Sequence, residues 1–499
     1  MTVSMIGAPR LDPLTTNTSS VRDRMTTLQR QLGTGQKAQT YAEVGSDRSL
    51  GIAFRQRLAS LESLQSSVTL IKTRIELVDQ YMNRLGEIPQ SMRQQINPAE
   101  FDLQGSDQTV AQRTAAASLG EMLDILNQDI NGRHLFAGAD IDVRPVVSAS
   151  ELMDGSGSED GFRTVLNERK RADLGADNRG RLAASTPAAT TLQLDETANN
   201  IYGFKLAGIS GNLTGANLTN TINAFPAAST VAVELTAQPA VGEQLSIDLD
   251  LPNGQQATLR LTATDSAAQT GEFEIGATVA DTFANMQAAV LAQLEQLGQT
   301  ELAAASAMQA ADDFFNLATN GYPLRVDGTP ETATANRDGS ADTITWYSGT
   351  LNGNDPRQDI VGRIDTGMSV GYGIRAIEDG FRMAVENLAV FAAETFSQTD
   401  SDAARYQALA IDVQENLSTP PTAETIQAIH ADVAAIYKAA ERAEDRHSVF
   451  QATLENYVQE IEGVDTERTA VEILALQTTI EASYRATSIL LDLTLSDYI

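Results

Sequence analysis

Apolar residues recur every seven positions between Ile52 and Leu85, in two series that are offset by three residues. Together the series are the a and d positions of a heptad repeat, which predicts a long helix with one apolar seam. At 1.5 Å per residue the helix is roughly 50 Å long, and Gly51 and Gly86 are expected to mark its ends. Such a seam needs a partner helix, either in an assembly or in an intramolecular bundle with no role in assembly. The residues expected to form this second helical layer are Leu61, Leu64, Val68, Ile71, Ile75 and Val78.

Shorter apolar stripes lie near the two ends of the sequence. The first stops at Gly33, and the second changes phase between Val464 and Ile473, as happens where a coiled coil is locally rewound. The stretch from Ile489 to Leu495 is apolar nearly all round, so we expect it to be buried in an assembly. The residues expected at this inner interface are Val21, Met25, Leu28, Leu32, Ile473, Leu476, Ile480, Tyr484 and Leu491.

The middle of the chain alternates apolar and polar residues instead. Residues 245–251 alternate strictly, Asn253-Gly254 marks a hairpin turn, and residues 231–235, 259–261 and 272–275 add strands. One face of a following helix carries Phe283, Met286, Val290, Leu294 and Leu297. We therefore expect a small α+β module over residues 184–325. A further helix is predicted from about Thr109 to Ile130.

The charge balance excludes several classes of partner. The chain has 66 acidic and 35 basic residues, so its net charge of -31 disfavours nucleic acid as a partner. Residues 184–320 carry 14 acidic and 2 basic side chains, as an exposed inserted module would. There is no cysteine, and no apolar stretch is long enough to predict a membrane span. No Sec-type signal is visible, so the protein stays inside the cell or leaves by another route.

Catalytic and metal-binding patterns are not found. The three histidines, His134, His430 and His447, have no metal-ligand spacing, and no phosphate loop or nucleophile elbow occurs. The loop Asp154–Gly161 could supply calcium ligands, but it does not match an EF-hand, so a solvated linker is favoured. Acidic pairs such as Asp312-Asp313 are expected to face solvent. We therefore predict no catalytic residues, no cofactor, no metal and no enzymatic activity.

Six segments stand out from the rest of the chain: Ile461–Asp465, Leu474–Tyr484, Leu493–Ile499, Asn131–Gly138, Trp346–Gly349 and Val370–Ala376. These segments resemble the bacterial flagellin family. Near the C-terminal end, the final residues resemble the members that join the flagellar hook to the filament more than they resemble filament flagellins. The resemblance covers about residues 1–145 and 340–499, and the middle is not covered. One departure is residues 42–48, which differ from the connection usual after the first helix.

The resemblance and the patterns together give one expected architecture. The fold class is mainly α with an inserted α+β module, in which long N- and C-terminal helices pair into a coiled-coil or helical-bundle stalk. Residues 1–45 and 450–499 would form an inner coiled-coil layer. Residues 46–150 and 340–449 would form a helical core layer. Residues 184–325 would project outward as the variable module.

The resemblance also implies a function. It implies a structural protein that joins hook to filament, is exported unfolded through the flagellar type III apparatus and resides outside the cell in the flagellum. The implied partners are other copies of the chain, a neighbouring hook-associated protein, flagellin and an export chaperone. A filament flagellin is the first alternative. An adhesive or carbohydrate-binding surface protein, acting through the module, is the second.

Overall fold

The computed structural model describes residues 12–40, 45–351, 355–418 and 424–496. Side-chain burial is described for residues 19–489 except 41–44, 46, 352–354 and 419–423. The chain divides into two compact units. Unit 1 comprises Met1–Lys72, Arg363–Ser369 and Lys438–Ile499, and unit 2 comprises Thr73–Gly362 and Val370–Tyr437.

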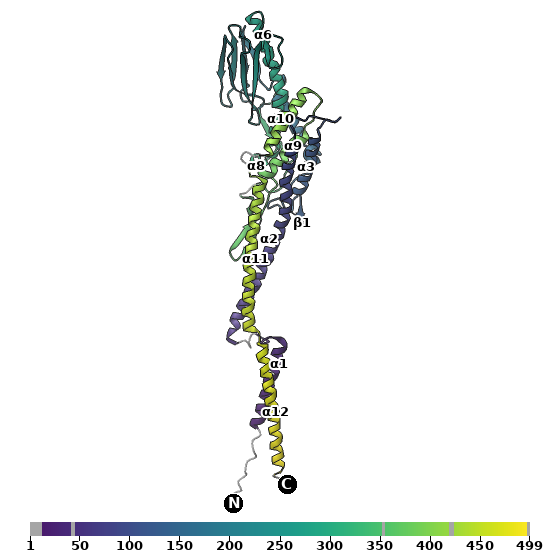
Figure 1. Cartoon of the computed structure of the whole chain (residues 1–499), viewed down its shortest axis with the longest axis vertical. Coiled ribbons are helices and arrows are strands. Elements are labelled where there is room, and N and C mark those ends of the chain that lie inside the picture. Colours follow the sequence, from purple (N-terminus) through teal and green to yellow (C-terminus); the bar gives the residue numbers. More distant parts are fainter. Residues whose placement is uncertain (1–11, 41–44, 352–354, 419–423, 497–499) are drawn as a thin grey trace. The chain divides into compact units, whose positions relative to one another are not determined.

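Unit 1 is built from helices. It contains α1 (Asp12–Thr34), α12 (Thr466–Ser496) and the adjoining parts of two longer helices, α2 (Arg48–Gln95) and α11 (Ile426–Glu462). The helices α1 and α12 run side by side (Figure 1). The segments that follow α1 and α11 also pair, because Lys37 N donates to Glu462 O at 2.8 Å and Val464 N donates to Gly35 O at 3.0 Å.

The helix α2 is longer than the heptad pattern predicts. It runs through Gly51 and Gly86 and includes Pro89 in its interior, so these residues do not end it. The apolar seam continues beyond Leu85, and Ile88 and Met92 are buried. Burial of this face outweighs the low helix propensity of glycine and proline, because packing can override an intrinsic preference of a few kcal/mol.

Paired helices also form the helical part of unit 2. There α3 (Val110–Leu126) packs on α9 (Asp379–Ala393), and α5 (Phe162–Leu174) packs on α7 (Ala303–Phe315). Trp346 and three phenylalanines, Phe162, Phe314 and Phe315, form an aromatic cluster in this core. The predicted helix 109–130 ends early, because residues 129–134 form a hairpin. The remaining helices here are α4 (Ala149–Asp154), α8 (Leu317–Asn320) and α10 (Asp400–Asn416).

Two four-stranded sheets and α6 (Val279–Leu297) share one apolar core in the middle of the chain (Figure 1). The strands expected at 231–235, 245–251, 259–261 and 272–275 are confirmed, and so is the helix after them. The antiparallel first sheet has the order β5 (Ala183–Ala188), β6 (Thr191–Asp195), β9 (Thr230–Leu235), β8 (Ala216–Thr221). The second has the order β12 (Glu272–Glu274), β11 (Gln256–Thr264), β10 (Gln244–Asp250), β7 (Lys205–Gly211), and β11 and β12 are parallel.

The smaller elements connect these parts. A five-residue π-helical turn, Gly298–Leu302, joins α6 to α7. Short 3₁₀ helices occupy Gly45–Asp47 and Pro356–Asp359. The short strands pair as β1 (Asp129–Ile130) with β2 (Arg133–His134), β3 (Gly155–Ser156) with β4 (Glu159–Asp160), β13 (Leu324–Val326) with β14 (Asn336–Asp338), and β15 (Val361–Asp365) with β16 (Met368–Gly371).

The expected fold class, a mainly α protein with a stalk of paired terminal helices, is wrong. About 52% of the chain is helical and 17% is strand, in several small sheets, so this is a mixed α/β protein. Strands also occur outside residues 184–325, because turns such as Asn131-Gly132 reverse the chain within segments that were expected to be helical. Contacts between α1 and α12 do not set the fold class, since most of the buried core belongs to unit 2. The expected division into three layers stays a prediction.

Candidate assembly surface

Exposed apolar side chains are concentrated in unit 1. The structure describes 19 large hydrophobic residues as exposed, and 11 of them belong to this unit. Four of these side chains are more than 60% exposed: Val449 at 70%, Leu70 at 68%, Val471 at 66% and Leu474 at 63%. Scattered exposed apolar residues are normal on a soluble protein, but their concentration on a few helices marks an interaction surface. The others in unit 1 are Leu32, Leu50, Met368, Phe450, Tyr457, Tyr484 and Ile489.

The pair of α1 and α12 buries little of its own apolar surface. Leu28 on α1 and Ile473 on α12 are the well-buried residues of the predicted set, each 8% exposed. Arg24 Nε donates to Glu472 Oε1 at 3.1 Å, and the Arg22 guanidinium lies 5.4 Å from the centre of the Tyr484 ring. Exposed ion pairs of this kind contribute about 0–1 kcal/mol. The pair is therefore held by a narrow apolar contact with polar flanks.

A second apolar face lies on α12, away from its contact with α1. Val471 and Leu474 are exposed on either side of buried Ile473, so they point elsewhere than the face against α1. Ile489 is 60% exposed and follows Val471 by about five helical turns, which places the two residues on the same side of the helix. This open face has no cover within the described part of the chain.

In unit 1, α2 and α11 are joined by polar and aromatic contacts along an apolar seam. Arg55 Nε donates to Glu462 Oε1 at 3.0 Å, and Lys72 Nζ donates to Glu444 Oε2 at 2.6 Å. The rings of Phe54 and Tyr457 are stacked with their centres 5.5 Å apart. The order of these pairs shows that the two helices run antiparallel.

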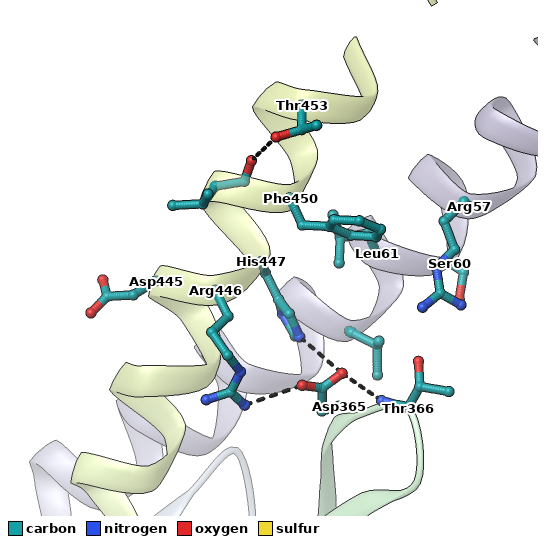
Figure 2. A pocket seen from close by; sticks show the side chains of 12 residues that line it. Arg57, Ser60, Leu61, Asp365, Thr366, Asp445, Arg446, His447, Phe450 and Thr453 are labelled. Atoms are coloured by element: carbon teal, nitrogen blue, oxygen red, sulfur yellow. Dashed lines mark hydrogen bonds and ion pairs between the residues drawn. The ribbon is translucent and has the colours of Figure 1, made fainter. Parts of the chain in front are cut away.

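A groove of about 540 Å³ opens beside this seam in unit 1. Figure 2 shows Leu61, Phe450 and His447 around it, with Asp365 and Thr366 from the β15–β16 turn. Asp365 accepts from Thr366 N at 2.7 Å and from Arg446 Nη2 at 3.1 Å. These donors lower the pKa of Asp365, with the backbone bond as the larger cause.

His447 is the unusual residue of this groove. It is only 3% exposed, and its ring nitrogens have no hydrogen-bond partner among the described residues. Its Nε2 lies 3.7 Å from Asp365 Oδ1, which is beyond hydrogen-bonding range (Figure 2). Leu61, Leu64 and Phe450 supply the apolar walls. The groove thus has apolar walls, with polar and charged side chains around them.

The residues predicted as interfaces differ in their burial. Leu32 and Tyr484 are exposed, whereas Val21, Met25, Leu64, Leu476 and Ile480 are half-buried. Ile75 and Val78 lie in unit 2, and the other predicted residues lie in unit 1. The side chain of Leu491 lies outside the described residues. The buried members are Leu28, Leu61, Val68, Ile71, Ile75, Val78 and Ile473.

Sequence reasoning missed the open faces. It selected the heptad positions, which are mostly turned inward, and passed over Leu70, Val449, Val471 and Leu474. The sequence did contain a signal for them. An apolar residue next to a heptad a or d position points in another direction on the helix, so it cannot lie in the same seam. Apolar residues outside the heptad positions, such as Leu70 and Val449, are therefore accessible to a partner.

The described part of the chain contains no cluster of three or more His, Cys, Asp or Glu side chains placed to hold a metal ion. Within the same residues, no helix combines the length and the hydropathy needed to cross a membrane. No protein-family model matches the sequence, and no curated protein matches it.

Proposed function

We propose that this chain is a structural protein of the bacterial flagellum that assembles with copies of itself and joins the hook to the filament, as hook-associated protein 3 does. One observation carries the proposal: the helices of unit 1 expose apolar faces that the described part of the chain does not cover. Burying a Val or Leu side chain fully is worth about 1.5–3 kcal/mol. Association that covers several such residues offsets the entropy lost when subunits come together.

The proposed occupant of these faces is a second copy of the chain, and its charge distribution supports this choice. Residues 1–100 carry 12 basic and 9 acidic side chains, although the whole chain has a net charge of -31. The rest of the molecule is therefore strongly acidic. A basic segment of one copy and an acidic surface of the next attract each other, which favours an ordered approach.

The resemblance to the flagellin family gives the proposal its biological setting. The residues that carry it include Leu474–Tyr484 on α12 and Asn131–Gly138 in unit 2. On this basis we place the protein outside the cell, exported unfolded through the flagellar type III apparatus. Its proposed partners are a neighbouring hook-associated protein, flagellin and an export chaperone. A chaperone would cover the apolar faces before assembly.

The test is deletion of the gene, followed by electron microscopy of the cells and an assay of the medium for flagellin. We expect bare hooks and flagellin released into the medium. Complementation with the wild-type gene should restore filaments. Shortened or altered filaments on the hooks would instead identify a filament flagellin. Normal filaments in the deletion strain would refute a flagellar function.

A further inference from the structure

The segment Asn131–Gly138 forms an anchored hairpin in unit 2. The strands β1 and β2 are joined by Asn131 and Gly132, whose φ angles are 55° and 77°, as in a two-residue hairpin turn. Gly132 N donates to Asp129 Oδ1 at 2.7 Å, which closes the turn. Immediately after it, Leu135 and Phe136 are fully buried. The hairpin is thus held at its base, and its tip presents the exposed side chain of Arg133.

Arg74 on α2 contacts this hairpin and is half-buried. Its Nη2 donates to His134 O at 3.2 Å, and its guanidinium lies 5.8 Å from the centre of the Tyr372 ring. No carboxylate lies within 4.0 Å of Arg74 or Arg133 among the described residues. A guanidinium has five N–H donors, so most of those on Arg74 have no acceptor in the described part of the chain.

This lack of a partner distinguishes Arg74 from the other arginines in the interior. Ten arginines in the described part of the chain are buried or half-buried. Eight of them form an ion pair with Asp or Glu. Arg181 forms none, but it donates to three oxygen atoms, those of Glu331, Ala333 and Asn200. Arg74, in contrast, donates to a single oxygen atom, the carbonyl oxygen of His134.

The Arg74 cation is partly withdrawn from water in the free chain. Burial lowers the pKa of Arg74, and the nearby positive charge of Arg133 acts in the same direction. None of its guanidinium nitrogens is both fully buried and without a hydrogen bond, so the N–H donors that have no protein acceptor reach solvent. A carboxylate that takes the place of this water would add charge-assisted hydrogen bonds. The free chain therefore holds a site that a carboxylate completes.

We infer that Arg74 and Arg133 form a binding site for a carboxylate side chain of a second copy of this chain. The inference rests on the proposed function and names one contact of that assembly. Guanidinium groups bind carboxylates through paired, charge-assisted hydrogen bonds, and the Tyr372 ring forms an adjacent wall. The chain offers 66 acidic residues against 35 basic ones, so a neighbouring copy is a ready source of the carboxylate.

The test compares the assembly of the full-length chain and its variants at low ionic strength, using sedimentation and pelleting to obtain the critical concentration. We expect Arg133→Gln to raise the critical concentration about tenfold and Arg133→Glu to raise it further. Arg133→Lys keeps the positive charge, so its critical concentration should stay close to that of the wild type. Arg133 is exposed on the turn, so these variants should keep the wild-type melting temperature. Arg74→Gln should act in the same direction.

The matched control is Arg260→Gln, because Arg260 is exposed on β11 and forms no ion pair in the described structure. Critical concentrations for Arg133→Gln and Arg74→Gln that equal that of Arg260→Gln would overturn the inference while leaving the proposed function standing. A wild-type chain that stays monomeric would overturn the proposed function itself. Binding of acetate to the monomer, with assembly unchanged in Arg133→Gln, would assign the site to a free anion and overturn the second-copy partner.

Discussion

Replacement of Leu474 by alanine should weaken assembly while leaving the stability of the folded chain unchanged. Leu474 is 63% exposed on α12, so truncating it should change the free energy of unfolding by less than about 0.5 kcal/mol. In the assembly the same side chain would be covered. Loss of three carbon atoms that are about two thirds exposed in the free chain corresponds to about 1–2 kcal/mol of lost burial. That free energy weakens subunit association about 5- to 30-fold.

The assay is the critical concentration for pelleting of the full-length protein, measured beside thermal unfolding by circular dichroism. Leu28→Ala is the matched control, because Leu28 is 8% exposed on α1 and its side chain is already buried in the free chain. We expect that variant to destabilise the pair of α1 and α12 by about 2–3 kcal/mol. Leu474→Ala should show the opposite profile, with normal unfolding and weakened assembly. Equal critical concentrations for Leu474→Ala and wild type would refute the reasoning.

Three further predictions concern separate parts of the molecule. Ile480→Asp should leave the two-sheet module folded and abolish incorporation into flagella, and normal incorporation of this variant would contradict the assembly role. Burial raises the pKa of Asp412 to about 6, so the folded state binds an extra proton between about pH 4 and 6. The stability from this group therefore rises as the pH falls through that window, by up to about 3 kcal/mol, and urea titrations should show the rise lost in Asp412→Asn. Burial likewise raises the pKa of Glu386 to about 8, so its contribution falls between about pH 5 and 8 as pH rises, and Glu386→Gln should flatten the wild-type curve there.

Each strand that was predicted from the sequence has one buried face. In β9, β10 and β11 apolar and polar residues alternate, and the apolar ones form the shared core with α6. Sequence reasoning missed β6 and β7, although one face of each is buried. It also missed β5 and β8, which are rich in small and polar residues and mostly exposed. Their pairing is set by the neighbouring strands β6 and β9 rather than by a pattern of their own.

The candidate surface was predictable only in part, for a related reason. A heptad pattern identifies the seam but not how much of it one chain covers. Val68 and Ile71 are buried, whereas Leu32 and Tyr484 remain exposed, and nothing in their spacing distinguishes them. The site at Arg74 was beyond sequence reasoning, because it depends on which carboxylates the fold brings near. Only the three-dimensional structure shows that no carboxylate of the described residues lies near Arg74.

The contact between α1 and α12 has a consequence for the order of events during synthesis. Arg24 and Glu472 are 448 residues apart in sequence. At about 5–20 residues per second, a ribosome needs roughly 20–90 s to reach the second residue after making the first. Throughout that interval α1 lacks its intramolecular partner, and its many Thr, Ser and Asn residues have low helix propensity, so the helix depends on packing for its stability. The nascent chain thus keeps this segment open to whatever binds unfolded polypeptide, and the pairing of α1 with α12 is a late step of folding.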